Sequence, residues 1–418
     1  MEDRIYMQRA IELARRGTGW VSPNPLVGAV IVKDGRVIGE GWHHKYGDLH
    51  AERDALANLT EPAEGAVIYV TLEPCCHYGK QPPCTLAIIE HGISRVVVGS
   101  RDPNPKVAGG GVRMLREHGV EVIEDFMREE CDALNPIFFH YITTGRPYVK
   151  MKYAMTADGK IATKTGASKW ITGEAARTRV HEWRHACMGI MAGIGTVLAD
   201  DPQLNCRIEN GRDPVRIICD THLRIPLDSQ ICRSAAQQKP IVACGLPALP
   251  EGAITEDVAA ACGAQSAGVE AAVQEQNVEA VVRGHNANVP ACDNPAAYMS
   301  LSPQLSEKLV HLLNSDVQVV NFPDDRGSVS LSKLMGYLGD QGVDSILLEG
   351  GATLNEAALR ERIVREIDVF VAPKIFGGQA KSPVAGFGVA VPDEALKMKI
   401  SSVEPIGDDI LLTYTVPM

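Results

Sequence analysis

The sequence predicts an α/β protein of two domains, and three observations support this. The chain has 418 residues, of which 45% are apolar, enough for two or three cores of ordinary size. Strand-like apolar runs alternate with segments of helical periodicity, as in layered folds with a largely parallel sheet. A loop of composition Thr-Thr-Gly-Arg-Pro at 143–147 interrupts this pattern. We therefore place the domains at residues 1–146 and 147–418.

In the first domain the elements follow one another at short intervals. Met7, Ala10, Ile11 and Ala14 recur at helical spacing and predict an opening amphipathic helix. An apolar strand at 27–32 precedes Lys-Asp-Gly-Arg, a hairpin signal that leads into a second strand. The same reasoning predicts further helices at 51–59, 85–91 and 110–118, and further strands at 66–71 and 95–99.

The second domain shows the same alternation with one exception. A strand is predicted at 149–155 and a helix at 174–187, followed by strands at 189–192, 215–219, 241–244, 317–321 and 345–348, and by a C-terminal hairpin around 407–409. Residues 246–300 are rich in alanine and contain a single aromatic residue, Tyr298. Because such a composition buries little apolar area, we expect an insertion that is partly disordered or weakly helical.

Charge and composition exclude several classes of function. The 41 basic and 52 acidic residues give a net charge of −11, and no Lys/Arg run supplies a local basic patch. Neither a nucleic acid nor a membrane is therefore an expected partner. No apolar run approaches the roughly 18 residues of a membrane span, and no signal peptide is evident. Eleven cysteines in a chain of this size indicate reduced thiols in the cytoplasm, used for a metal or for catalysis.

The most specific motif combines His50-Ala51-Glu52 with Pro74-Cys75 and a later Cys84. Zinc deaminases carry H-x-E and a downstream P-C-x-x-C, in which one imidazole and two thiolates hold the metal. The acid two residues after the histidine stays off the metal and moves protons. A structural zinc site would not require that acid, so the motif favours catalysis.

The spacing leaves the ligand set open, because Cys75 and Cys84 are separated by eight residues and not by two. Cys76 is the main rival as a ligand. His43, His77 and His91 are also near in sequence. The alternative interpretations are a structural zinc knuckle and a set of unrelated core thiols, since free cysteine often behaves as a small buried hydrophobe.

In the second domain the residues alone are less specific. The stretch 345–355 reads as a strand, the pair Gly350-Gly351 and the start of a helix. Glycines there allow backbone N–H groups at a helix N-terminus to approach a phosphate. A tight strand–helix turn without a ligand explains the pattern equally well.

Several stretches together resemble the bifunctional riboflavin-biosynthesis deaminase–reductase family. In the first domain they are Ser-Pro-Asn-Pro-Leu-Val-Gly at 22–28, Gly-Trp-His-His at 41–44, 50–52, 71–84, Asp-Pro-Asn-Pro at 102–105 and the glycines at 109–111. In the second they are 152–162, 168–173, 195–207 and 349–351. The resemblance covers nearly the whole chain except 246–300, and in that family the eight-residue gap between the thiolates is the expected form.

The resemblance implies a fold and an activity for the first domain. The fold is a three-layer α/β/α unit of the cytidine-deaminase type, with zinc at helix N-termini. Its zinc ligands would be His50, Cys75 and Cys84, and Glu52 would be the proton shuttle. The substrate, a diaminopyrimidinone with a ribosylamino 5′-phosphate, would lose one exocyclic amine. Residues that would grip it are Asn24, His43, His77 and Lys80, although each of these also reads as a solvent-facing loop residue.

For the second domain the resemblance implies a dihydrofolate-reductase-like α/β fold that uses NADPH to reduce the ribosyl group of the deaminated product to ribityl. NADPH would contact Ala154, Trp170, Thr196, Asp200, Thr221, Gly351, Ala352, Thr353 and Leu354. The substrate would face Ser168, Arg184, Leu204, Arg207 and Glu349. Lys152 either polarises the opened ribose aldehyde or lies exposed on its strand. The family also suggests a homo-oligomer assembled through this domain.

Two other functions remain open at this level. A nucleic-acid deaminase shares the zinc motif, but predicts P-C-x-x-C spacing and a basic surface, both of which this sequence lacks. The closer alternative is a zinc deaminase of another nucleoside or nucleobase whose C-terminal domain only binds a ligand. The C-terminal domain has no residue set as strict as the zinc motif, so the residues alone do not separate an active reductase from a binding module.

Overall fold

The computed structural model describes residues 2–78, 82–105, 107–254, 301–386 and 388–417. The chain divides into two compact units, Met1–Tyr148 with Gly342–Ser345 and Val149–Gln341 with Ile346–Met418. Lys80 and residues 255–300, the greater part of the predicted insertion, lie outside the described residues.

The N-terminal unit contains a five-stranded sheet of order β2-β1-β3-β4-β5. The hairpin turns β2 back on β1, and β1 also runs antiparallel to β3, whereas β3, β4 and β5 are parallel. The expectation of a largely parallel sheet is therefore wrong for this unit, whose sheet is mixed. The strands are β1 Gly28–Lys33, β2 Arg36–Trp42, β3 Val67–Leu72, β4 Arg95–Ser100 and β5 Glu121–Ile123.

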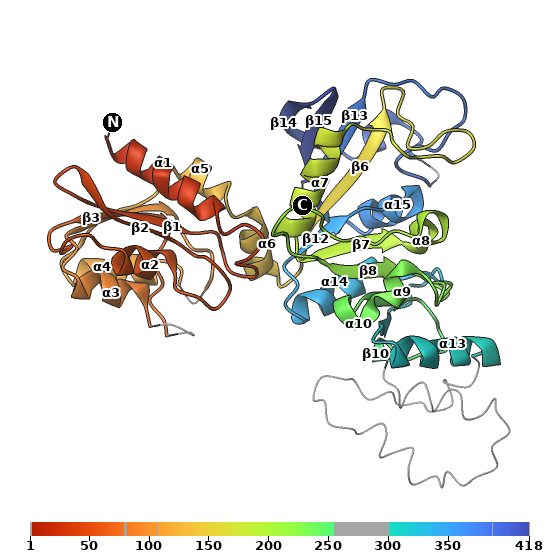
Figure 1. Ribbon diagram of the computed structural model, residues 1–418, viewed down its shortest axis with the longest axis horizontal. Helices are drawn as coiled ribbons and strands as arrows, with labels where there is room; N and C mark the ends of the chain where they lie inside the picture. The colour runs from red at the N-terminus through yellow and green to blue at the C-terminus, as the bar shows by residue number, and fades with distance from the viewer. Residues whose placement is uncertain (1, 79–81, 106, 255–300, 387, 418) are drawn as a thin grey trace, which may run out of the picture. The chain divides into compact units, whose positions relative to one another are not determined.

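Helices cover both faces of this sheet, which confirms the three-layer α/β/α prediction (Figure 1). Because side chains alternate along a strand, Val30 and Val32 pack toward α1, and Ala29 and Ile31 pack toward α2, α3 and α4. The helices are α1 Glu2–Arg15, α2 Ala51–Ala57, α3 Cys84–Glu90, α4 Gly110–Glu117, α5 Arg128–Asp132 and α6 Pro136–Thr144. The elements β5, α5 and α6 were not predicted.

A close backbone approach brings α2 against the sheet. A Cβ atom at Gly41 on β2 would lie 2.2 Å from the backbone nitrogen of Ala55 and 2.6 Å from the carbonyl oxygen of Ala51. Only glycine permits this distance between strand and helix. The first turn of α2 is therefore seated directly on β2.

The C-terminal unit is built on a ten-stranded sheet of order β10-β11-β9-β8-β7-β12-β6-β13-β15-β14. Its interior pairs β11–β9, β9–β8, β8–β7, β7–β12 and β6–β13 are parallel, and the C-terminal β13–β15–β14 pairings are antiparallel. The strands are β6 Tyr148–Thr156, β7 Gly189–Gly193, β8 Val215–Cys219, β9 Ile241–Cys244, β10 Gly252–Ile254, β11 Gln318–Asn321, β12 Ser345–Leu348, β13 Val364–Ala372, β14 Lys399–Ile406 and β15 Asp409–Thr415.

Helices pack on this sheet through separate apolar clusters. Ile194 and Val197 of α8, Ile231 of α9 and Leu309 of α13 join one large cluster with residues of β7, β8 and β9. α7 contributes Val180 to another cluster over β13 and β15. The helices are α7 Glu174–Ala186, α8 Ile194–Asp200, α9 Gln230–Arg233, α10 Ala235–Gln238, α13 Pro303–Asn314, α14 Leu331–Asp340, α15 Ala352–Arg360 and the 3₁₀ turn η2 Pro392–Glu394.

Two strands of this unit differ from expectation. β10 lies inside the segment expected to be partly disordered or weakly helical, and it pairs antiparallel with β11 while Ile254 is buried. The prediction is therefore wrong for this described part of the insertion. β13 was missed because its charged residues obscure the apolar pattern. Asp368, 1% exposed, is paired with Lys150 of β6 at 2.9 Å, and Glu366 binds the same ammonium group.

Candidate functional site

The three predicted zinc ligands come from two helix N-termini and the loop that follows β3. His50 is the N-cap of α2, Cys84 begins α3, and Cys75 lies three residues beyond the end of β3. The Nδ1 atom of His50 lies 3.6 Å from Cys75 Sγ and 3.5 Å from Cys84 Sγ. All three ligand atoms fall within 4.8 Å of one another. One imidazole and two thiolates at this separation fit a tetrahedral zinc ion with one position left for water.

Local electrostatics favour a thiolate in this group. Hydrogen bonding to the Cys84 thiol and to His50 lowers the pKa of Cys75 to about 4. The same contact with Cys75 raises the pKa of His50. Since the thiolate is the form of cysteine that binds a metal, the site is chemically prepared for one.

Cys76, the rival ligand, is not part of this group. It is absent from the set of metal-binding side chains that the described residues bring together. Its Sγ atom lies instead against the start of α4, 2.8 Å from where a Cβ atom of Gly110 would stand. Burial raises the pKa of Cys76, which keeps its thiol protonated. The geometry therefore selects Cys75 and Cys84.

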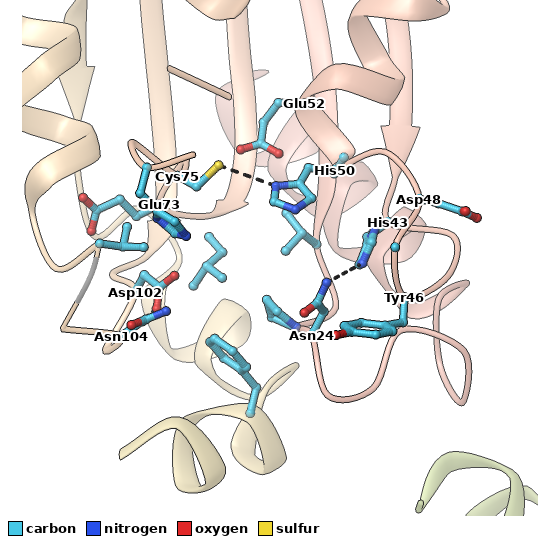
Figure 2. Close-up of a pocket in the computed structure, with 18 residues that line it drawn as sticks. Asn24, His43, Tyr46, Asp48, His50, Glu52, Glu73, Cys75, Asp102 and Asn104 are labelled. Atoms are coloured by element: carbon cyan, nitrogen blue, oxygen red, sulfur yellow. Dashed lines mark hydrogen bonds between the residues drawn. The ribbon is translucent and has the colours of Figure 1, made fainter. Parts of the chain in front are cut away.

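Glu52 lies in the first turn of α2 and is 4% exposed. Burial raises the pKa of Glu52 to about 7, and the negative charge at Cys75 acts in the same direction. Figure 2 shows its carboxylate beside His50 and Cys75, directed into the pocket. A carboxyl group that titrates near neutral pH can both take and return a proton during a reaction.

These residues line a cavity of about 260 Å³, large enough for part of a small ligand. The predicted substrate residues Asn24, His43 and His77 also line it. His43 Nδ1 donates to the carbonyl oxygen of Leu49 at 2.9 Å, so its Nε2 accepts from the Asn24 amide at 3.0 Å (Figure 2). Burial lowers the pKa of His43 and keeps the ring neutral. The Nδ1 atom of His77 is buried and has no hydrogen-bond partner among the residues that the structure describes.

The cavity also contains acidic residues to which the sequence analysis gave no role. Burial raises the pKa of Asp102 to about 6, and its carboxylate accepts from the backbone of Asn104 at 2.8 Å. Glu73 accepts backbone N–H groups of Gly109 and Gly111, both at 3.1 Å, at the start of α4. The motif at 102–105 was part of the family resemblance, so Asp102 and Asn104 could have been predicted as site residues. The Glu73 contacts depend on tertiary structure and could not.

In the C-terminal unit the predicted NADPH contacts gather at the carboxyl ends of neighbouring strands. Ala154 lies on β6, Thr196 on α8 directly after β7, Thr221 after β8, and Gly351 after β12. In open α/β sheets such ends form the usual ligand crevice. Gly351 is the N-cap of α15, and among the described residues a Cβ atom there would meet nothing within 4 Å. This open helix terminus fits a phosphate group of a dinucleotide.

An irregular loop, residues 157–173, joins β6 to α7. Trp170 is 65% exposed, with the Arg177 guanidinium 4.7 Å from its ring centre. Lys169 lies 3.8 Å from the carboxylate of Asp200, another predicted cofactor contact. An exposed indole at such a position offers a flat surface for a planar ring.

The predicted substrate residues of this unit form a buried ion pair and its surroundings. Arg184 binds Glu349 through two hydrogen bonds, at 2.7 and 3.0 Å, and also donates to the carbonyl oxygen of Asn205. Glu182, two residues earlier in the same helix, pairs instead with Arg179. Burial alone would raise the pKa of Glu349, but the charges of Arg184 and Lys152 hold it below the usual value. Lys152 is half-buried on β6 and not exposed, and its burial lowers its pKa.

Arg207 and Leu204 occupy different environments. Arg207 is exposed and donates to Nε2 of His181 at 3.2 and 3.1 Å. Burial and the charges of Arg184 and Arg207 lower the pKa of His181 to about 4, so this ring is neutral. The Leu204 side chain is 4% exposed and belongs to the core, which leaves only its backbone to face a ligand. Ser168 lies partly exposed on the loop before Trp170. His181 was missed, since a histidine within a helix carries no signal of its own.

The described residues contain no helix of the length and apolar character that crossing a membrane requires.

Comparison with known proteins identifies both units. Residues 1–100 match the family model for the cytidine and deoxycytidylate deaminase zinc-binding region, and residues 147–247 and 269–412 match the RibD C-terminal domain. The riboflavin biosynthesis protein RibD of Actinobacillus pleuropneumoniae is 47% identical over 100% of this chain and 96% of that protein. The protein of the same name from Bacillus amyloliquefaciens is 36% identical over 98% of this chain and 95% of its own length.

Solved structures agree over the full length. Acinetobacter baumannii RibD, form 1, superposes with a TM-score of 0.77 at 33% identity, covering 100% of this chain and 99% of that one. A Thermotoga maritima diaminohydroxyphosphoribosylaminopyrimidine deaminase/5-amino-6-(5-phosphoribosylamino)uracil reductase gives a TM-score of 0.76 at 34% identity with the same coverage. With its zinc-binding deaminase region, its reductase domain and this similarity from end to end, the chain belongs to the RibD family of bifunctional riboflavin-biosynthesis enzymes.

Proposed function

We propose that the chain first deaminates 2,5-diamino-6-(5-phosphoribosylamino)pyrimidin-4-one and then reduces the ribosyl group of 5-amino-6-(5-phosphoribosylamino)uracil to ribityl. Deamination belongs to residues 1–146 and reduction to residues 147–418. The observation that carries this proposal is the cluster of His50, Cys75 and Cys84 at a cavity that His50, Cys75 and the buried Glu52 line. The family match over the whole chain favours it over a deaminase with a C-terminal binding module.

In the deaminase unit we assign zinc to His50, Cys75 and Cys84. Zinc bound there supplies a water that is deprotonated near neutral pH. Glu52 would accept one proton of the attacking water and deliver it to a ring nitrogen. It would then move the remaining hydroxyl proton to the amine, which leaves as ammonia, and its pKa near neutrality favours both transfers. The neutral His43 fixes the orientation of the Asn24 amide, whose oxygen then accepts from an amine on the pyrimidine. His77 and Lys80 are assigned to the ribose phosphate.

In the reductase unit NADPH supplies the hydride, and the chain aligns the sugar with it. We assign to the cofactor the residues Ala154, Trp170, Thr196, Asp200, Thr221 and 351–354. The Arg184 guanidinium donates two hydrogen bonds to Glu349 and so holds that carboxylate toward the sugar. Only its remaining N–H groups are available to a ligand. Arg207, exposed and paired with a neutral histidine, is the better phosphate clamp. Lys152 is assigned to the carbonyl of the opened sugar, and Ser168 and the Leu204 backbone are assigned to the same substrate.

Product masses test this directly. The purified chain is incubated with the diaminopyrimidinone ribosyl phosphate with and without NADPH. We expect exchange of an amine for oxygen without NADPH, and added hydrogen only when NADPH is present. Deamination that stops at the first product would favour the binding-module alternative. No mass change in protein that holds zinc would contradict the assigned substrate.

We also propose that the chain forms a homo-oligomer through the outer edge of its ten-stranded sheet. β14 is an edge strand, and Ile400 and Val403 on it are 65% and 59% exposed. Leu396 and Met398, just before it, are also exposed. An exposed apolar edge strand is a template for pairing with a second copy. Light scattering should give a mass above one chain, and the double variant Ile400→Glu/Val403→Glu should reduce it to one. A wild-type mass of one chain would contradict the proposal.

A cytoplasmic location is proposed on chemical grounds. Metal binding by Cys75 and Cys84 needs both thiols reduced, which is the state that the cytoplasm maintains. Fractionation of cells that express the chain should place it with the cytoplasmic enzymes, and recovery from an oxidising compartment would contradict this.

A further inference from the structure

After β13 the chain crosses the loop that carries Trp170. In this bridging segment, residues 374–385, the Nζ atom of Lys374 donates to the carbonyl oxygens of Trp170 at 2.9 Å and of Ile171 at 2.7 Å. The backbone of Ile161 donates to Lys381 at 3.0 Å. The irregular loop between β6 and α7 is therefore attached to the bridging segment at several points.

Asp158, at the start of that loop, binds the bridging segment directly. One carboxylate oxygen accepts the backbone N–H of Phe376 at 3.1 Å and the other accepts that of Gly377 at 2.7 Å. The hydroxyl of the buried Thr156 donates to the same carboxylate at 2.5 Å. These three donors lower the pKa of Asp158 to about 2, so the carboxylate is ionised at neutral pH. Hydrogen bonds to an ionised acceptor are about twice as strong as neutral ones.

The bridging segment turns sharply at the point that Asp158 holds. Gly377 and Gly378 have φ angles of 67° and 62°, which favour glycine at both positions. Two glycines in succession are conformationally free in the absence of a partner. The Asp158 carboxylate supplies that partner at the first of them.

The far end of the bridging segment reaches the helix assigned to the cofactor phosphate. Ala385 donates its backbone N–H to the carbonyl oxygen of Ala352 at 3.0 Å. The side-chain amide of Asn355 donates to the carbonyl oxygen of Pro383 at 2.9 Å. One stretch of chain thus connects the Trp170 loop with the first turn of α15.

We propose that Asp158 and Lys374 are positioning residues of the reductase, which hold the Trp170 loop and the N-terminus of α15 at the spacing that NADPH requires. The proposal rests on the cofactor contacts assigned above. Neither residue is placed in contact with the reacting atoms. Their loss leaves an irregular loop that must be ordered when the cofactor binds, and ordering lowers affinity. The effect should therefore fall on KM for NADPH and leave kcat largely unchanged.

The test compares Asp158→Asn and Lys374→Met with the wild type in steady-state reduction of the deaminated substrate. Each variant should raise KM for NADPH at least about tenfold, with kcat at saturation within about threefold. Asp393→Asn is the matched control, because Asp393 is an exposed acid in η2, in the same C-terminal region, and has no part in these contacts. Deamination, measured on the same preparations, should equal that of the wild type in all three.

Hydrogen exchange adds a measurement that catalysis does not affect. In Asp158→Asn, peptides that cover 168–171 and 352–355 should exchange faster than in the wild type without ligand, and saturating NADPH should restore protection in both. An unchanged KM, or faster exchange confined to 376–378, would overturn the positioning role while the reductase activity stood. A wild type that neither binds nor oxidises NADPH would overturn the proposed function, and this inference with it.

Discussion

The deaminase cavity and the reductase crevice of this chain concentrate their chemistry differently. In the first, His50, Glu52, Cys75 and Cys84 come from one pair of helix N-termini and one loop, and the three ligand atoms lie within 4.8 Å. In the second, the assigned residues are distributed over the carboxyl ends of several strands. Where the protein supplies the reacting groups, they are few and close together. Where a cofactor supplies the reacting groups, the chain mainly positions the cofactor and the substrate, and single substitutions should lower activity less.

The largest expected effect separates the two cysteines that were rivals for the metal. Cys84→Ala should lose zinc and reduce deamination below detection, because two protein ligands do not hold a catalytic zinc site. Cys76→Ala should keep zinc at one ion per chain and most of its activity. Metal content by mass spectrometry and product formation check both. Zinc loss in Cys76→Ala, with zinc kept in Cys84→Ala, would reverse the ligand assignment.

Glu52→Gln should reduce kcat for deamination about 10³-fold, because the amide cannot carry the proton. Zinc content should stay at the wild-type level, as should NADPH-dependent reduction of deaminated substrate supplied from outside. The control is Glu64→Gln, an exposed acid of the same unit. If Glu52→Gln kept its deamination activity, Glu52 would not be the proton carrier, and the contrast between the two sites would fail.

Arg184→Lys should lower reductase activity by less than Glu52→Gln lowers deamination. We expect a loss of about 10- to 100-fold in kcat/KM for the sugar phosphate. Lysine cannot reproduce the two-point contact with Glu349, which is worth about 1.5–3 kcal/mol. Arg179→Lys is the matched control, since Arg179 lies in the same helix and pairs with the more exposed Glu182 and Glu404. Equal losses in both variants would indicate damage to α7 and not to the site.

The smallest expected effect concerns pH. The pKa of His181 is lowered from the ordinary value of 6.5 to about 4 in the folded chain. Between pH 6.5 and pH 4 the unfolded chain therefore binds more protons at this residue than the folded chain does. Stability should therefore fall as pH falls from about 6.5 to about 4, with a slope of at most one proton from this residue. His181→Asn should make the dependence shallower, as calorimetry at successive pH values can show. A steeper dependence in the variant would contradict the assignment.

Elements with a regular apolar pattern were predictable from sequence. The spacing of Met7, Ala10, Ile11 and Ala14 predicted α1, and the mostly apolar strands β7, β8, β9 and β12 lie within one residue of expectation. β13 was not predictable, because Asp368 is buried only through its pairing with Lys150, more than two hundred residues earlier. Long-range ion pairs leave no periodic trace in the sequence.

The zinc group was predictable for a different reason. The chemistry of the ligands restricts their type, and the family pattern restricts their spacing, so His50, Cys75 and Cys84 were found before any geometry. The role of Cys76 was not, since adjacent cysteines on a loop point in different directions that only the fold decides. Likewise the Arg184–Glu349 pair joins residues whose sequence positions carry no common signal.

The glycine under α2 has a consequence for how the deaminase unit can vary. The backbone of α2 rests on Gly41, and the same helix begins with His50 and carries Glu52 in its first turn. A single methyl group at Gly41 would meet the backbone of α2, and so would displace the proposed metal ligand His50 together with the proposed proton carrier Glu52. Mutational tolerance at this outer strand should therefore be as low as at the motif itself, and random libraries of this unit should return almost no active clones altered there.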